Sequence, residues 1–138
     1  MSESEAVITR GIARALGPFL IVFGASVAMK AGDMPLFIPA FFHDAIFVFV
    51  IGAFTLGLGC ALFAAHHHWS SLAAIIISVF AIATAARGAA LLAAPGIVST
   101  LAANVAHVSG LVFIPATIAV IIGAYLSYVG WFSRKQAS

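Results

Sequence analysis

Charged residues are scarce in this chain: Lys, Arg, Asp and Glu make up 7% of its 138 residues, against about 25% in an ordinary soluble domain. Hydrophobic residues make up 64%, and the mean hydropathy is +1.20. The apolar runs have no polar face at helical spacing, which excludes a soluble helical bundle. We predict an integral membrane protein whose main partner is the lipid bilayer.

Cysteine and recognisable catalytic motifs are also scarce. The single cysteine, Cys60, lies in an apolar run, so a disulfide within the chain is excluded. The net charge of +2 is small and dispersed, and we therefore predict no nucleic-acid partner. The sequence contains no nucleophile paired with a base at a readable spacing, no glycine-rich phosphate loop and no His-Glu helix motif. Nothing here supports an enzyme, although the question stays open.

Long apolar runs dominate what is present. About 20 residues at a rise of 1.5 Å cross a hydrocarbon core of about 30 Å. Four segments have that length, near residues 11–31, 44–65, 71–93 and 106–130. They lack the alternation of polar and apolar residues that is typical of barrel strands. We predict an all-α fold in which residues 1–138 form one domain, an integral membrane four-helix bundle.

Prolines suggest where these helices end. Pro35 and Pro39 lie in the turn-rich "GDMPLFIP", where we expect no helix to continue. Pro95 and the following glycine should stop the third helix. Residues 96–107 are ambiguous and are compatible with a short interfacial helix. Pro115 removes a backbone hydrogen bond within the fourth segment, so we expect a kink there.

The basic residues indicate the orientation. Four of them flank the first and last spans: Arg10, Arg14, Arg134 and Lys135. Positive charge marks the cytoplasmic side, so we predict that both termini face the cytoplasm (N-in/C-in) in a multi-pass protein of the cell inner membrane. Trp69 and Trp131 then lie at that same interface. Lys30 is the one basic residue that we place at the far end of a span against this rule.

Small residues recur at helical spacing. The stripes are Ala53, Gly57, Ala61 and Ala65 in the second span, Ala81, Ala85 and Ala89 in the third, and Gly17 and Gly24 in the first. Small side chains let helices approach closely in lipid, where leucine gains nothing over an acyl chain. The stripes therefore indicate packing within one bundle, with any excess available for a homo-oligomer or a larger membrane complex.

The polar residues within or beside the spans gather on the outer side. We predict a cluster of Arg87, Asp44, His43 and His107 there. Arg87 lies about 9 Å before the end of its helix, and an arginine at the bilayer centre costs about 2.5–3.5 kcal/mol. It can extend to the headgroups or pair with Asp44, and the sequence leaves both alternatives open.

Histidines raise the question of a metal or haem. His43, Asp44 and His107 are the candidate metal ligands. His66, His67 and His68 are weaker candidates, because successive helical residues point about 100° apart and cannot converge on one ion. The histidines all lie outside the middle of the spans, which argues against a buried haem. We therefore favour no cofactor, and the sequence leaves an interfacial haem open.

Three stretches carry a resemblance: "RALGPFLIVFGASV", "GLGCALFAAHHHW" and "RGAALLAAP". The chain resembles a set of uncharacterised small bacterial four-helix integral membrane proteins. The resemblance implies four spans, a central loop holding His66 to Trp69, and a bacterial inner membrane. It carries no function. Arg87 departs from the set, in which we expect lysine or a neutral residue.

Three functional hypotheses remain. The first is a structural or accessory role, in which the chain packs as a homo-oligomer or as a subunit of a larger membrane complex. The second is a channel or transporter for a proton or small solute, using the outer polar cluster. The third is a metal- or haem-binding redox subunit.

Overall fold

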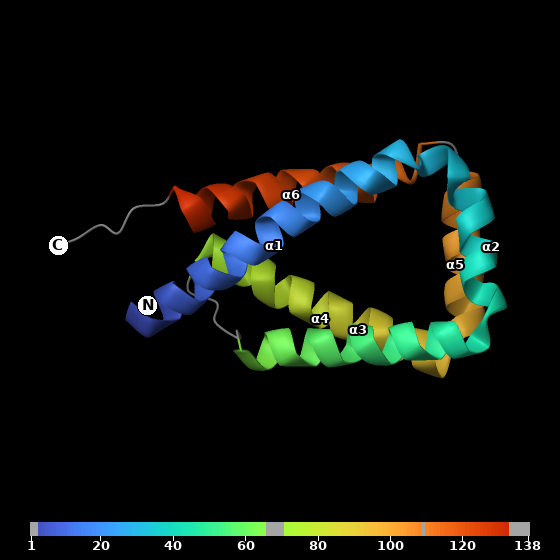
Figure 1. Cartoon of the computed structure of the whole chain (residues 1–138), viewed down its shortest axis with the longest axis horizontal. Helices are drawn as coiled ribbons and strands as arrows, with labels where there is room; N and C mark the ends of the chain where they lie inside the picture. Colours follow the sequence, from blue (N-terminus) through green and yellow to red (C-terminus); the bar gives the residue numbers. More distant parts are fainter. Residues whose placement is uncertain (1–2, 66–70, 109, 133–138) are drawn as a thin grey trace.

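The protein is an all-α membrane protein. The computed structural model describes residues 3–65, 71–108 and 110–132, and these residues contain no strand. The α-helices are α1 (Glu3–Met29), α2 (Met34–His43), α3 (Ala45–Ala65), α4 (Leu72–Ala93), α5 (Pro95–His107) and α6 (Phe113–Trp131), with a short 3-10 helix η1 (Ala31–Asp33) after α1 (Figure 1).

Four of these helices are long and apolar enough to cross a membrane. The spans are Ala6–Met29, Ala45–Ala65, Leu72–Ala93 and Phe113–Trp131. The prediction of a multi-pass, four-span helical protein is confirmed. The beginning of α1 and the end of α6 lie at the same end of the molecule (Figure 1), as an even number of spans requires.

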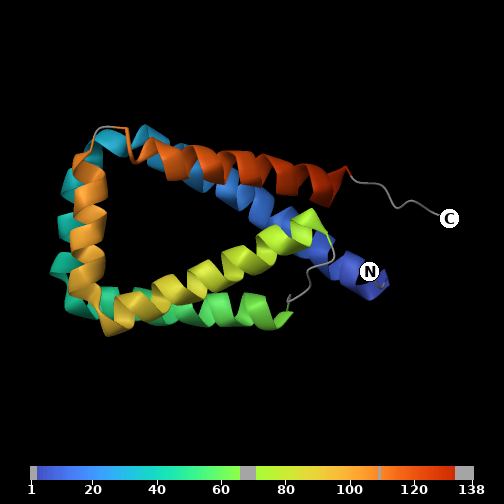
Figure 2. The same cartoon turned by 180° about the vertical axis from the view of Figure 1, so that it is seen from behind.

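The spans are arranged as two antiparallel pairs. Helix α1 packs along α6, and α3 packs along α4, as both views show (Figures 1 and 2). The cross-helices α2 and α5 lie side by side and connect the pairs at one end. The chain therefore folds as two helix pairs joined by a cross-piece.

Glycines set the approach within the α3/α4 pair. A Cβ atom on Gly59 would overlap the backbone of Ala85, and one on Gly88 would overlap the backbone of Leu56. Gly52 is packed less tightly. A Cβ atom there would lie 3.1–3.2 Å from side-chain atoms of Leu91 and Leu92. Backbone contact of this kind is the means by which helices associate in lipid.

The α1/α6 pair is also built on glycine. A Cβ on Gly24 would lie 2.7 Å from the carbonyl oxygen of Ala116, and one on Gly123 would lie 2.7 Å from the carbonyl oxygen of Gly17. Gly17 in turn faces Ser127. Gly17 and Gly24, which the sequence predicted as packing residues, therefore pack against α6.

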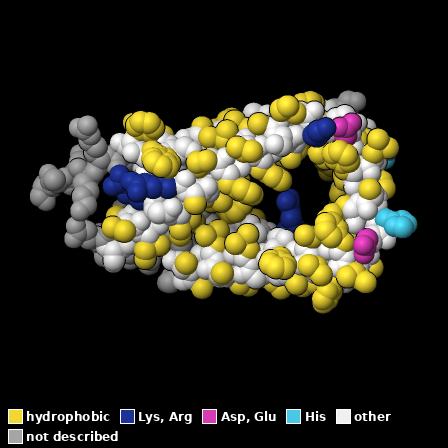
Figure 3. Space-filling model, viewed as in Figure 1, with side chains coloured by type: hydrophobic (Ala, Val, Ile, Leu, Met, Phe, Trp, Pro, Cys, Tyr) yellow, Lys and Arg dark blue, Asp and Glu magenta, His cyan; other side chains and the backbone are white. Residues whose placement is uncertain are grey.

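The described residues of the two pairs share a buried cluster at one end. A buried cluster from α1, α4 and α6 joins them there: Ala13, Leu20, Ala73, Ile77 and Leu126. We call this cluster the closed end. Away from it the pairs separate, and the space-filling view shows an opening between them (Figure 3). We call the opposite end, where α2 and α5 cross, the open end.

The first cross-helix lies where we predicted a turn. Helix α2 contains both Pro35 and Pro39. Pro35 is in the first turn, where a missing N–H removes no helical hydrogen bond. Pro39 is interior, and its missing N–H leaves the carbonyl of Pro35 without its helical donor. The prolines therefore shape a short helix instead of preventing one.

The second cross-helix accounts for the segment that we found ambiguous. Pro95 is the first residue of α5, so it ends α4 and begins the next helix. The last span then begins at Phe113 instead of residue 106. Pro115 consequently lies in the first turn of α6, so the kink expected within the fourth span has no physical cause. Pro18 is interior to α1.

Candidate functional site

Arg87 faces the opening between the helix pairs. Residues 73, 80 and 87 are seven apart and share one face of α4. Ala73 belongs to the closed end and Phe80 packs against it, whereas Arg87 is exposed. The face that touches α1 and α6 at the start of α4 thus looks into open space about four turns later. Figure 3 shows a basic side chain standing in this opening.

Asp44 does not pair with Arg87. Its Oδ1 accepts hydrogen bonds from the backbone N–H groups of Ile46 and Phe47, each at 3.0 Å. Asp44 has an extended backbone, so it serves as the N-cap of α3. Among the described residues the ion pair that forms is Lys30 with Asp33, at 3.6 Å. Lys30, the basic residue that departs from the orientation rule, thus forms an ion pair with a residue three positions along the chain.

The cross-helices hold the two outer histidines apart. His43 ends α2 beside α3, and His107 ends α5 on the side of α6. The helices run antiparallel (Figure 1), so a cross-helix length of about 15 Å separates them. Within the described ranges there is no group of three His, Cys, Asp or Glu side chains that could hold a metal. The candidate ligands His43, Asp44 and His107 are not brought together.

His66, His67, His68 and Trp69 fall outside the described residues, so their weaker candidacy as ligands stays a prediction. Cys60, a few residues earlier in α3, is exposed.

The opening has apolar walls. Phe23 of α1 lies seven residues after Leu16, and Ile118 of α6 lies seven before Tyr125; both Leu16 and Tyr125 pack against the closed end. Phe23 and Ile118 therefore continue the same helix faces toward the open end, and each is about half exposed. Ile118 also lines an apolar hollow on α6 together with Phe113 and Ile114.

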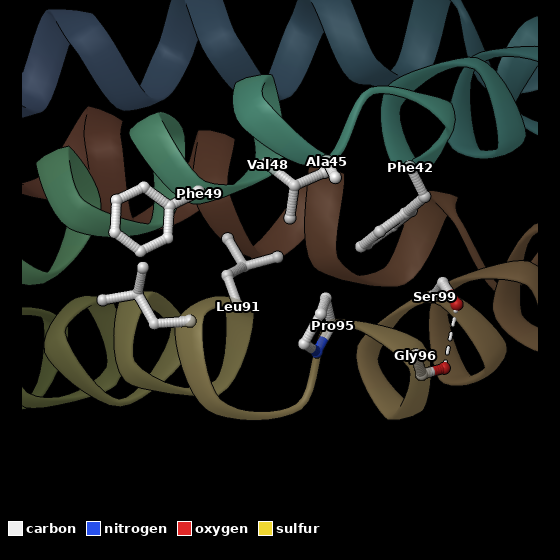
Figure 4. A pocket seen from close by; sticks show the side chains of 9 residues that line it. Phe42, Ala45, Val48, Phe49, Leu91, Pro95, Gly96 and Ser99 are labelled. Atoms are coloured by element: carbon white, nitrogen blue, oxygen red, sulfur yellow. Dashed lines mark hydrogen bonds between the residues drawn. The ribbon is translucent and has the colours of Figure 1, made fainter.

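A separate cavity lies at the corner where α3 and α4 meet the cross-helices. Its volume is about 280 Å³, and Phe42, Phe49 and Leu91 contribute apolar walls (Figure 4). Its one hydroxyl, Ser99 Oγ, donates to the carbonyl of Gly96 at 2.8 Å. The other lining side chains are apolar, so the cavity offers an apolar contact and no recognisable side-chain chemistry.

A polar contact at the other end was missed in the sequence. Arg14 Nε donates to the carbonyl oxygen of Gly130 at 2.7 Å, and its guanidinium lies 5.6 Å from the centre of the Trp131 ring. The bond satisfies one of the last carbonyls of α6. Arg14 and Trp131 had both been assigned to one interface, which was the available signal that they could meet.

The opening around Arg87 is thus the place where a charged group and apolar walls come together at membrane depth. In comparisons with known proteins, the chain matches no family model, no curated protein and no solved structure.

Proposed function

We propose that the chain is a structural or accessory protein of the cell inner membrane that packs with a second copy of itself through α3. The proposal rests on a difference between the glycines of α3: two of them contact α4, and one contacts no other helix. Gly52 and Gly59 lie against α4, whereas a Cβ on Gly57 would meet nothing within 4 Å.

The unused glycine belongs to a continuous face. Ala53 and Ala61 lie four residues on either side of Gly57, and all three are exposed. Gly57 points about 140° away from Gly52 around the helix axis, so this face looks away from α4. A small-residue face of this kind supports close approach of another helix in lipid.

A second copy is the simplest partner. Two α3 helices related by a two-fold axis place the same residues on both sides of the contact, so one face suffices for both subunits. A different membrane protein that presents a small-residue helix is the alternative occupant, in which case the chain is a subunit of a larger complex.

Oxidative cross-linking in native membranes tests the proposal. The chain has a single cysteine, so Cys60→Ser removes every thiol. Adding Ala61→Cys then places one thiol on the face of α3 that contains Gly57. We expect a covalent dimer in most of the protein after mild oxidation. Adding Gly57→Leu to this variant should lower the dimer yield at least fivefold without affecting folding, since Gly57 touches nothing within its own subunit.

The matched control is Cys60→Ser with Ala124→Cys, which places the thiol on an exposed position of α6. Equal dimer yields from Ala61→Cys and Ala124→Cys would indicate random collision and contradict the proposal. A cross-linked product of another mass would replace the second copy with a different subunit.

The other two hypotheses have less support. Solute conduction through an outer polar cluster needs Arg87, Asp44, His43 and His107 near one another, and a redox role needs converging ligands. The resemblance to uncharacterised bacterial four-helix proteins stays a prediction and adds no activity to either.

A further inference from the structure

Arg87 has a charge that its own chain does not balance. Its side chain is exposed to the opening, and it has no hydrogen-bond or ion-pair partner among the described residues. It lies six residues, or about 9 Å, before the end of α4. An arginine deep in a bilayer costs about 2.5–3.5 kcal/mol unless an anion or water meets it.

A second copy of the chain does not supply the anion. The four spans contain no acidic residue. Asp33 and Asp44 lie at the open end, where Lys30 and the start of α3 engage them. The spans therefore offer no carboxylate to balance Arg87, and at this depth the neighbouring molecules are lipids.

The surroundings of Arg87 suit the rest of a lipid molecule. Phe23 and Ile118 flank the opening with half-exposed apolar side chains, and the hollow beside Ile118 is lined by Phe113, Ile114 and Thr117. An acyl chain that lies between the helix pairs would cover these side chains. The long stem of Arg87 can extend toward the open end, so that its guanidinium reaches headgroup level.

We propose that the opening between the two helix pairs binds one anionic phospholipid, with its phosphate on Arg87 and an acyl chain against Phe23 and Ile118. A planar guanidinium binds phosphate oxygens through two parallel hydrogen bonds, which makes arginine a better partner than lysine here. A zwitterionic lipid has the same phosphate, but its own ammonium group offsets the charge. We therefore expect the site to prefer a phospholipid with net negative charge over a zwitterionic one.

Native mass spectrometry of the protein released from nanodiscs tests this site. The nanodiscs contain equal amounts of phosphatidylglycerol and phosphatidylcholine. We expect the parent protein to retain one phosphatidylglycerol with at least tenfold preference over phosphatidylcholine. Arg87→Gln should reduce that preference to less than twofold, and Arg87→Lys should leave it near threefold.

Two controls separate the site from general charge and from free anions. Lys30→Gln removes an exposed basic residue outside the opening and should leave the preference unchanged. Inorganic phosphate at 10 mM should not displace the lipid, because it lacks the acyl chain. Ile118→Ala should lower lipid retention about threefold while keeping the headgroup preference.

Several outcomes would overturn the proposal. They are equal lipid retention by the parent and Arg87→Gln, equal loss with Lys30→Gln, or displacement of the lipid by inorganic phosphate. Arg87→Gln removes a charge from a span, so we expect this variant to insert into the membrane. If it fails to fold, Arg87→Lys tests the proposal instead, and an unchanged lipid preference in that variant would contradict it. Dimer formation through Ala61→Cys should not change in Arg87→Gln, which separates this site from the α3 contact.

Discussion

Contacts within the helix pairs differ in kind from the contact between them. Within the α3/α4 pair, Gly59 and Gly88 bring backbone against backbone, and Gly24 and Gly123 do the same in the α1/α6 pair. Between the pairs, side chains such as Leu20, Ile77 and Leu126 make the contact at the closed end.

This difference has a physical consequence in a membrane. Backbone contact gives many short-range attractions that lipid cannot replace, whereas an apolar side chain packs almost as well against acyl chains as against protein. The pairs are therefore the stable units, and the contact between them is the weaker joint. Three substitutions sharpen this comparison.

The largest effect should come from breaking a pair. Gly88→Val places a side chain against the backbone of Leu56, which cannot move aside. We expect the free energy of unfolding in mixed micelles to fall by about 3 kcal/mol. Gly57→Val is the matched control on α3, and it should change the stability of the monomer by less than about 0.5 kcal/mol. Similar losses in both variants would show that helix propensity, not backbone contact, controls the effect.

A smaller loss should follow from weakening the joint between the pairs. Ile77→Ala truncates a fully buried side chain of the closed end. We expect a loss of about 2 kcal/mol, at the low end for a buried isoleucine, because an apolar side chain packs almost as well against acyl chains once the pairs separate. Ile82→Ala, at an exposed position of the same helix, is the control. A loss from Ile77→Ala larger than that from Gly88→Val would reverse the proposed ranking of the two contacts.

The smallest effect should come from the polar link between α1 and α6. Arg14→Met keeps an apolar stem but removes the hydrogen bond to Gly130 and the contact with Trp131. We expect a loss of about 1 kcal/mol and a shift of the Trp131 fluorescence, measured in a Trp69→Phe background. Lys30→Met serves as the control. An unchanged Trp131 spectrum would count against the cation–π contact.

The small residues show how far sequence patterns reach. The stripe of Ala81, Ala85 and Ala89 predicted one packing face. In the structure Ala81 is buried, Ala85 lies against Gly59, and Ala89 is exposed. The glycines of α3 that contact α4 are Gly52 and Gly59. They are seven residues apart, so they do not belong to the predicted stripe, whose members are four residues apart. The pattern identified residues able to pack closely but not which helix they would meet.

The candidate site was predictable in part. Arg87 was identified because a charge within an apolar span is costly wherever the helix lies. Its pairing with Asp44 was not predictable. Asp44 directly precedes α3, and two local backbone N–H groups satisfy its Oδ1, so the cap competes with any distant partner.

The sequence by itself determined the membrane environment, the four spans and the even topology, because hydropathy and helix length depend on local composition alone. Only the tertiary structure decided that α1 pairs with α6, that Pro35 and Pro95 begin cross-helices, and that the pairs separate around Arg87. These features depend on which backbones approach one another, and residues that are equally apolar in sequence give no sign of their partners.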